Sequence, residues 1–201
     1  MEQLEKLALE AMEKNGFQVV HLKDAKAVKD YLLENITPEN SVGCGGSVSV
    51  QESGILDALE ARGNKVFSHW RAEDKAAAMR SARCADVYLT SANAVTKGGK
   101  LVLVDGTGNR VGAVCDGPRQ VYFVIGRQKL VDGGINTAVA RIKKQACPPN
   151  ASRLGLDTPC ARTGICGADC PDSMCRLTLT VDRTPRGRSF TVIWVEEPLG
   201  Y

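Results

Sequence analysis

The sequence predicts an α/β fold in which a parallel-rich sheet is flanked by helices, and three observations lead to that prediction. Amphipathic helical patterns alternate with short strand patterns through residues 1–147. Helices of about ten or more residues separate the strand patterns, which is the length that a crossover between parallel strands needs. The segment RQVYFVIG contains a run of consecutive apolar residues, as expected for a strand buried on both faces.

The first elements are a helix, a strand and a second helix. Residues 2–14 place their apolar side chains on one helical face, and Gly16 is expected to end that helix. FQVVHL at residues 17–22 predicts a strand. Asp24 is expected to cap the second helix, which ends before Pro38.

The central part of the chain begins with a short strand that leads into the glycine loop GCGGS at residues 43–47. A helix over residues 50–61 is expected next, because Ser49 and Glu52 have the spacing of a capping box. KVFSHW predicts a strand, residues 73–83 a helix, and DVYLTSA a further strand. NAVTKGGKLVLVDG contains two β-rich segments around Gly98 and Gly99, a pattern typical of a hairpin.

The last part of the chain changes character after Cys147-Pro148-Pro149. Before this point we expect a short helix in GNRVGAVCDG, a buried strand in RQVYFVIG and a helix over residues 132–145. After it, RLTLTVD and SFTVIWVEE are alternating segments joined by a turn at residues 185–187. The sequence therefore predicts an α/β domain over residues 1–147, with a cysteine loop and β-hairpin over residues 148–201 packed on it.

Composition limits the class of protein. The 201 residues are 43% hydrophobic and 24% charged, with a net charge of +3, which gives no argument for nucleic-acid binding. The N-terminal helix carries too many charges for a signal peptide, and no apolar run approaches the ~20 residues of a membrane span. We therefore expect a cytoplasmic protein without a membrane partner. The strand pattern SFTVIWV is a possible pairing edge for a homo-oligomer.

Four of the eight cysteines crowd into the run PCARTGICGADCPDSMC, at positions Cys160, Cys166, Cys170 and Cys175. Clustered thiolates are the ligands of iron–sulfur clusters and of structural zinc, and a reducing cytoplasm disfavours a disulfide frame. The spacing matches neither the bacterial ferredoxin run nor paired zinc knuckles. We expect an iron–sulfur cluster, 4Fe-4S in type, while zinc, disulfides and free thiols stay open as alternatives. The role of Cys147 is also open.

The glycine loop is the first candidate ligand site. It lies where a strand is expected to pass into a helix, so its backbone amides favour a small anionic substrate. Glu52 beside the loop is a weak candidate for a nucleophile or base, and capping explains it equally well. Cys44 in the loop is expected to be a small buried residue. The expected ligand contacts are Gly45, Gly46, Ser47 and Ser49.

A second candidate site lies in SANAVTKGGKLVLVDGTGNRVG, where polar side chains flank glycine turns at the expected strand ends. In open α/β sheets, the crevice beyond the carboxyl ends of the strands is where ligands bind. The same residue types also form turns, so this alternative remains. Lys129, after the following strand, is a candidate cation for an anionic ligand, and both histidines are expected to pack. The candidate contacts here are Asn93, Asp105, Asn109 and Arg110.

The chain resembles the lactate-utilisation (LUD) domain family. The resemblance rests on GGSVSVQESGILDAL, ADVYLTSANAVTKGGKLVLVDGTGNRVGAVCDGPRQVYFVIG, AVARIKKQACPPNASRL, the spaced cysteines after TPC, and PLGY. It implies a fold similar to CoA transferases and ribose-phosphate isomerases, and a context of lactate oxidation to pyruvate beside iron–sulfur partner proteins. The glycine loop, the segment that holds Asn93, Asp105, Asn109 and Arg110, and Lys129 match family positions. The four clustered cysteines correspond to a pattern in only some members. Gln128 stands where the family often has Asn.

Three functions follow as hypotheses. The first is an iron–sulfur component in the oxidation of a small hydroxy acid, with flavin or iron–sulfur partner proteins supplying the remaining redox chemistry. The second is a transferase or isomerase with Glu52 as nucleophile or base. The third is a non-catalytic subunit or ligand-binding module.

Overall fold

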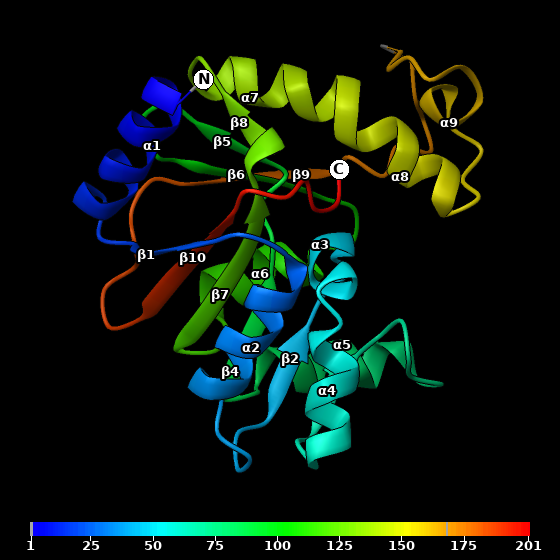
Figure 1. Cartoon of the computed structure of the whole chain (residues 1–201). Helices are drawn as coiled ribbons and strands as arrows, with labels where there is room; N and C mark the ends of the chain where they lie inside the picture. The colour runs from blue at the N-terminus through cyan, green and yellow to red at the C-terminus, as the bar shows by residue number, and fades with distance from the viewer. Residues whose placement is uncertain (1, 168) are drawn as a thin grey trace.

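The computed structural model describes residues 2–167 and 169–201, which form two stacked sheets flanked by helices (Figure 1). The larger sheet has six parallel strands in the order β1-β10-β7-β4-β2-β3. Their bounds are β1 Gln18–Leu22, β2 Val42–Cys44, β3 Val66–Ser68, β4 Val87–Thr90, β7 Gln120–Gly126 and β10 Ser189–Val195. The predicted α/β class with a parallel sheet flanked by helices is confirmed.

The smaller sheet has four strands in the order β8-β5-β6-β9. Its strands are β5 Ala94–Thr96, β6 Leu101–Asp105, β8 Leu130–Val131 and β9 Leu177–Val181. β5 and β6 are antiparallel, as the hairpin signal around Gly99 predicts, and Gly99 has the positive φ of +70° that the turn requires.

Helices lie along the chain between these strands. They are α1 Glu2–Lys14, α2 Ala25–Asn35, α3 Val48–Glu52, α4 Ile55–Arg62, α5 Lys75–Arg83, α6 Asn109–Asp116, α7 Ile135–Arg141, α8 Cys147–Arg153 and α9 Pro159–Thr163, with a 3₁₀ turn at Arg127–Lys129 and a π-helical turn at Ile142–Ala146. In the described part of the chain, no helix has the length and apolar character that crossing a bilayer requires.

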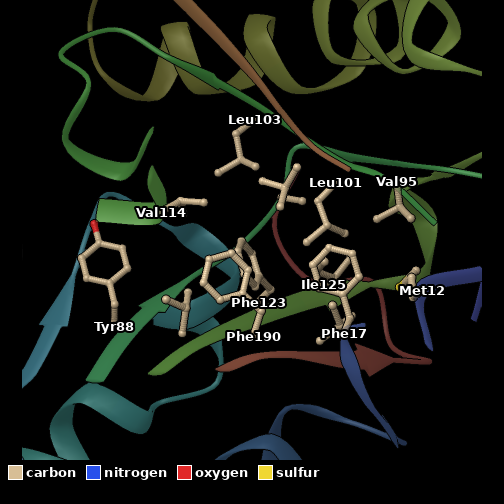
Figure 2. Packing of buried hydrophobic residues seen from close by; sticks show 14 of the residues in the cluster. Met12, Phe17, Tyr88, Val95, Leu101, Leu103, Val114, Phe123, Ile125 and Phe190 are labelled. Atoms are coloured by element: carbon tan, nitrogen blue, oxygen red, sulfur yellow. The ribbon is translucent and has the colours of Figure 1, made fainter. Parts of the chain in front are cut away.

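Alternation along the strands builds the layers. On β7, Phe123 packs between the two sheets, whereas Val124 packs against the opposite layer, which holds α2, α3 and α4. On β6, Leu103 faces the larger sheet and Val102 faces the layer of α7 and α8. Figure 2 shows the resulting inter-sheet core, in which Phe123 and Phe190 lie below the side chains of β6. The period of two in the strands therefore places three apolar layers.

The prediction of a C-terminal β-hairpin is wrong. β9 pairs with β6 in the smaller sheet, and β10 lies between β1 and β7 in the larger one (Figure 1). All of β10 after Ser189 is buried, because its two faces contribute to two different cores. Its near-continuous apolar sequence, FTVIWV, agrees better with a central parallel strand than with a hairpin edge.

Two helix boundaries also differ from expectation. The helix expected over residues 50–61 is divided into α3 and α4 by Gly54, whose φ is +67°. The helix expected to end at residue 145 continues through the π-helical turn into α8, with prolines in the first turn of α8. Pro148 and Pro149 lie in the first turn of α8, where a missing N–H is tolerated, and the α-helical hydrogen-bond pattern is already interrupted by the π-helical turn before them.

Candidate functional site

The candidate site lies where three neighbouring parallel strands end. β7, β4 and β2 are adjacent in the sheet, and each is followed by a polar segment. Lys129 follows β7, Ser91 follows β4, and the glycine loop follows β2. Because the carboxyl ends of parallel strands share one edge, residues 80 positions apart in the chain meet there.

Lys129 is the centre of this site. Its side chain is buried, with only 3% of the residue exposed, and Nζ donates to Ser49 Oγ at 2.7 Å and to Ser91 Oγ at 3.0 Å. Burial, together with the neighbouring charges of Arg141 and Arg110, lowers the pKa of Lys129 to about 7, against a smaller opposing effect of Glu52. The amine is therefore largely neutral at mildly alkaline pH.

Arg110 and Asn93 form the next part of the site. Both terminal nitrogens of Arg110 lie 3.4 Å from Asn93 Oδ1, and Arg110 Nη2 also donates to the Val104 carbonyl. Burial opposes ionisation of Asp105, but Arg110 and backbone N–H groups of residues 107, 108 and 111 outweigh it and hold the pKa of Asp105 below its usual value. Asp105 therefore anchors Arg110 and the start of α6.

Arg141 on α7 is a second buried cation beside Lys129, and Arg110 is part-buried. Its terminal nitrogens donate to the Asn93 carbonyl at 2.8 Å and to the Gln128 carbonyl at 3.4 Å. Among the described residues, its buried Nε has no hydrogen-bond partner. Cations therefore outnumber carboxylates around Lys129, which favours an anionic ligand.

These residues surround two adjoining cavities. The inner one has a volume of about 60 Å³, and Lys129, Ser91, Asn93 and Arg110 line it together with part of the glycine loop. The outer one has a volume of about 390 Å³ and shares Arg110 with the inner one. A water needs roughly 10–15 Å³ of such volume, so the inner cavity has room for about four to six waters. This is comparable to a ligand with about six non-hydrogen atoms.

The glycine loop contributes in a different way from the one expected. Of the predicted contacts, Gly46, Ser47 and Ser49 line the inner cavity, but Gly45 does not. A Cβ on Gly45 would lie 2.4 Å from Arg110 Cγ, so this glycine instead makes room for Arg110. Ser47, not Ser49, is the N-cap of α3, and the expected capping box is wrong.

Glu52 holds the C-terminal residues. Its Oε2 accepts the Gly200 N–H at 2.6 Å, and Ser49 Oγ donates to the Leu199 carbonyl at 3.0 Å. Glu52 lines neither cavity, whereas Tyr201 lines the inner one. The geometry thus assigns Glu52 to positioning the tail over the site.

The outer cavity carries an aromatic wall. The Arg153 guanidinium lies 4.7 Å from the centre of the Trp70 ring, and Trp70 in turn packs over Gly46. His69 lines the same cavity, its Nδ1 has no hydrogen-bond partner among the described residues, and burial lowers its pKa. Asn109 lies here and accepts from Thr107 Oγ1 at 3.0 Å, so it does not reach the inner cavity.

The cysteine loop lies beyond α8, near one end of this helical layer (Figure 1). Cys160 is buried on α9, Cys166 is exposed, and Cys170 and Cys175 are partly exposed. Cys147, on α8, lies with its Sγ 3.3 Å from Cys175 Sγ. Their contact raises the pKa of Cys147 and lowers that of Cys175 to about 6, since one thiol donates to the other.

Among the described residues, the cysteine loop is not arranged as a metal site. Within residues 2–167 and 169–201, no three cysteine, histidine or carboxylate side chains converge closely enough to hold a metal ion. The thiols suit iron–sulfur or zinc by their chemistry, but the tetrad is not assembled in this arrangement.

Sequence reasoning missed several residues at the site: Ser91, Arg141, Trp70, His69 and Tyr201. Ser91 lies inside the segment SANAVTK and was recognisable as a polar residue at a strand end. Arg141 carried no signal, because a lone arginine on an amphipathic helix is usually exposed. The expectation that Cys44 is buried is confirmed, and burial raises its pKa to about 12.

Comparisons with known proteins agree with this fold. The LUD domain family model matches residues 5–195. A crystal structure of a DUF162 family protein from Deinococcus radiodurans superposes with a TM-score of 0.58 at 12% sequence identity, covering 96% of this chain and 97% of that one. Among curated proteins, none matches. At such low identity, the structural likeness concerns the fold.

Proposed function

Because this chain belongs to the LUD domain family, we propose that it takes part in oxidising a small hydroxy acid such as lactate to pyruvate, holding the acid in the inner cavity. The observation that carries this proposal is the buried Lys129, which lines a cavity of about 60 Å³ with Arg110 and Asn93. A monocarboxylate of about six non-hydrogen atoms fits that volume, whereas a nucleotide does not.

The surrounding charges support a carboxylate as the recognised group. Arg110 carries a guanidinium whose N–H groups beyond those directed at Asn93 and the Val104 carbonyl can donate charge-assisted hydrogen bonds to a carboxylate. Lys129 Nζ then contacts the hydroxyl or carbonyl oxygen on the neighbouring carbon. Charges that are shielded from water interact strongly, so the small cavity between part-buried and buried cations favours selective binding of an anion.

Oxidation of a hydroxy acid releases a pair of electrons and a pair of protons. Among the described residues, none supplies an electron acceptor without a bound group, so a flavin or iron–sulfur partner protein is part of the proposal. The family context of lactate utilisation supports such a partner.

Ligand binding tests the proposal. We expect lactate and pyruvate to raise the melting temperature of the protein and to give a saturable calorimetric signal, while Lys129→Met abolishes both. Lys97→Met is the matched control, because Lys97 is an exposed lysine away from both cavities. Absence of binding to the wild-type protein at millimolar concentrations of either acid would exclude this function.

We further propose that Cys160, Cys166, Cys170 and Cys175 bind an iron–sulfur cluster of the 4Fe-4S type, after the loop closes around it. The support is the density of soft ligands in one short loop. When bound, such a cluster supplies one-electron transfer. Structural zinc is the competing occupant.

Anaerobic purification followed by iron, sulfide and zinc analysis distinguishes these occupants. We expect about four irons and matching sulfide per chain. Serine at any of the four loop positions should lower the iron content, whereas the exposed Cys115→Ser should leave it unchanged. One equivalent of zinc, or no metal in the wild-type protein, refutes the cluster.

The alternative transferase or isomerase function depends on Glu52 facing a substrate. Glu52 lines neither cavity and accepts a hydrogen bond from the Gly200 N–H. No observation favours this alternative over hydroxy-acid binding.

A further inference from the structure

The hydrogen bonds around Lys129 leave the lone pair of its neutral amine nitrogen without a partner. Ser49 Oγ donates its proton to the Leu199 carbonyl at 3.0 Å, and Ser91 Oγ donates to the Ala92 carbonyl at 3.0 Å. Each hydroxyl can therefore offer only a lone pair to Lys129 Nζ. A neutral amine uses both of its N–H bonds on these two serines, and its nitrogen lone pair remains free.

That free position belongs to the side chain of Lys129, a residue that lines the inner cavity. Lys129 is 3% exposed, and the cavity wall also includes Arg110 and Asn93. The neighbouring cations Arg110 and Arg141 disfavour a third positive charge, and Glu52 is the carboxylate that opposes them. A neutral nucleophile thus lies beside groups that suit a carboxylate.

We propose that Lys129 forms a reversible imine with the carbonyl carbon of a short 2-oxo acid held in the inner cavity. This inference rests on the proposed function, in which such an acid is the oxidation product. A 2-oxo acid carries its carbonyl directly beside its carboxylate, so pairing of the carboxylate with Arg110 brings the carbonyl toward Lys129.

The reaction needs no oxidant or reductant. The nitrogen lone pair forms the N–C bond while the carbonyl oxygen takes up a proton from the nitrogen. The resulting hydroxyl then leaves as water with the second nitrogen proton, and the C=N bond forms. Addition of water reverses both steps and releases the oxo acid. The serine hydroxyls hold the amine in place before the attack and are not consumed.

Reductive trapping tests this inference. The full-length protein is incubated with pyruvate and treated with sodium borohydride, which converts an imine to a stable secondary amine. We expect one adduct per chain in the intact mass spectrum, on the peptide that contains Lys129. Lactate has no ketone carbonyl and should give no adduct. Lys129→Arg should lose the adduct, whereas Lys97→Arg should keep it.

The pH dependence of trapping gives a second readout on the wild-type protein, which is useful if Lys129→Arg folds poorly. The adduct should form faster as pH rises through about 7, where the amine loses its proton, and should level off above it. A rate that keeps rising to about pH 10 would identify ordinary exposed lysines as the source and overturn the inference.

Calorimetry in parallel separates this inference from the proposed function. Pyruvate binding without a trapped adduct overturns the imine and leaves hydroxy-acid binding intact. Neither binding nor adduct overturns both. Adducts spread over many lysines also overturn the imine, and a single adduct on Lys129 establishes it.

Discussion

Lys129 couples ionisation to folding. In the unfolded chain its amine has the ordinary pKa of 10.5, and in the folded protein the pKa falls to about 7. Between these values, the unfolded state binds more protons than the folded state, so the free energy of unfolding rises with pH. Below about pH 7 both states are protonated, and this contribution no longer changes.

Replacing this amine should remove that pH dependence. The wild-type protein should gain unfolding free energy between about pH 7 and about pH 9.5, whereas Lys129→Met should not. The difference in unfolding free energy, variant minus wild type, should therefore be larger at the lower pH by on the order of a few kcal/mol. Urea denaturation of both proteins at the two pH values measures the difference, and other titrating groups cancel between them. An equal difference at both pH values would show that Lys129 keeps an ordinary pKa when folded.

Glu52 offers a test of positioning against catalysis. Glu52→Gln keeps an oxygen acceptor for the Gly200 N–H but removes its charge. We expect a loss of about 1 kcal/mol in unfolding free energy and retained ligand binding. The matched control is Glu34→Gln, an exposed glutamate on α2. Complete loss of activity with unchanged stability would instead assign Glu52 to catalysis.

The glycine loop and the helical layer show how elements are shaped by their neighbours. The loop passes so close to α6 that a side chain at Gly45 would meet Arg110 Cγ at 2.4 Å and the Tyr88 hydroxyl at 2.7 Å. The chain stays helical past Pro148 because a π-helical turn precedes α8 and the prolines lie in the first turn of α8, where proline is tolerated. Both features depend on tertiary context more than on local propensity.

Gly45→Ala should therefore displace Arg110 and weaken anion binding. We expect a loss of pyruvate affinity of tenfold or more, because Arg110 would leave Asn93 and the inner cavity (about 1.4 kcal/mol per factor of ten). Calorimetry measures this loss. Gly134→Ala is the control, because Gly134 has open space around it and an ordinary φ of −94°. Equal affinity of both variants would refute a role for the Gly45–Arg110 contact.

The two sheets together depend on the last fifty residues. β10 pairs with both β1 and β7, and β9 completes the smaller sheet beside β6. Phe190 and Trp194 are fully buried in the core between the sheets. The segment after Cys147 is thus integral to the fold, and a chain ending there would leave β1 without a strand partner.

Phe190→Ala tests this dependence without truncation. We expect a loss of about 3–5 kcal/mol in unfolding free energy, because removal of the buried ring leaves a cavity beside Phe17 and Phe123. Leu7→Ala, at a residue that is 54% exposed, should cost far less. Chemical denaturation measures both, and similar losses would argue that β10 is peripheral.

Local patterns were sufficient for most of the elements. Helical periodicity and the Asp24 cap predicted α1 and α2, and the glycine pair predicted the β5–β6 turn. Polar residues at strand ends predicted Asn93, Arg110 and Lys129 as site residues, and all three line the inner cavity. The correct secondary-structure predictions depend on short-range physics, in which backbone conformation is set by nearby residues, whereas ligand binding by the three cavity residues stays a prediction.

Contacts between distant parts of the chain decide the strand order and the surroundings of the candidate site. Alternation in the last two strand patterns fits a hairpin as well as it fits two separate sheets, and only the packing of apolar faces selects the latter. Residues distant in the chain also meet in the contact between Cys147 and Cys175 and in the hydrogen bond between Glu52 and Gly200. Arg141 is likewise buried by segments distant in the chain. Composition and periodicity thus specify the α/β class and its elements, whereas strand order and the surroundings of Lys129 arise from contacts that no local pattern encodes.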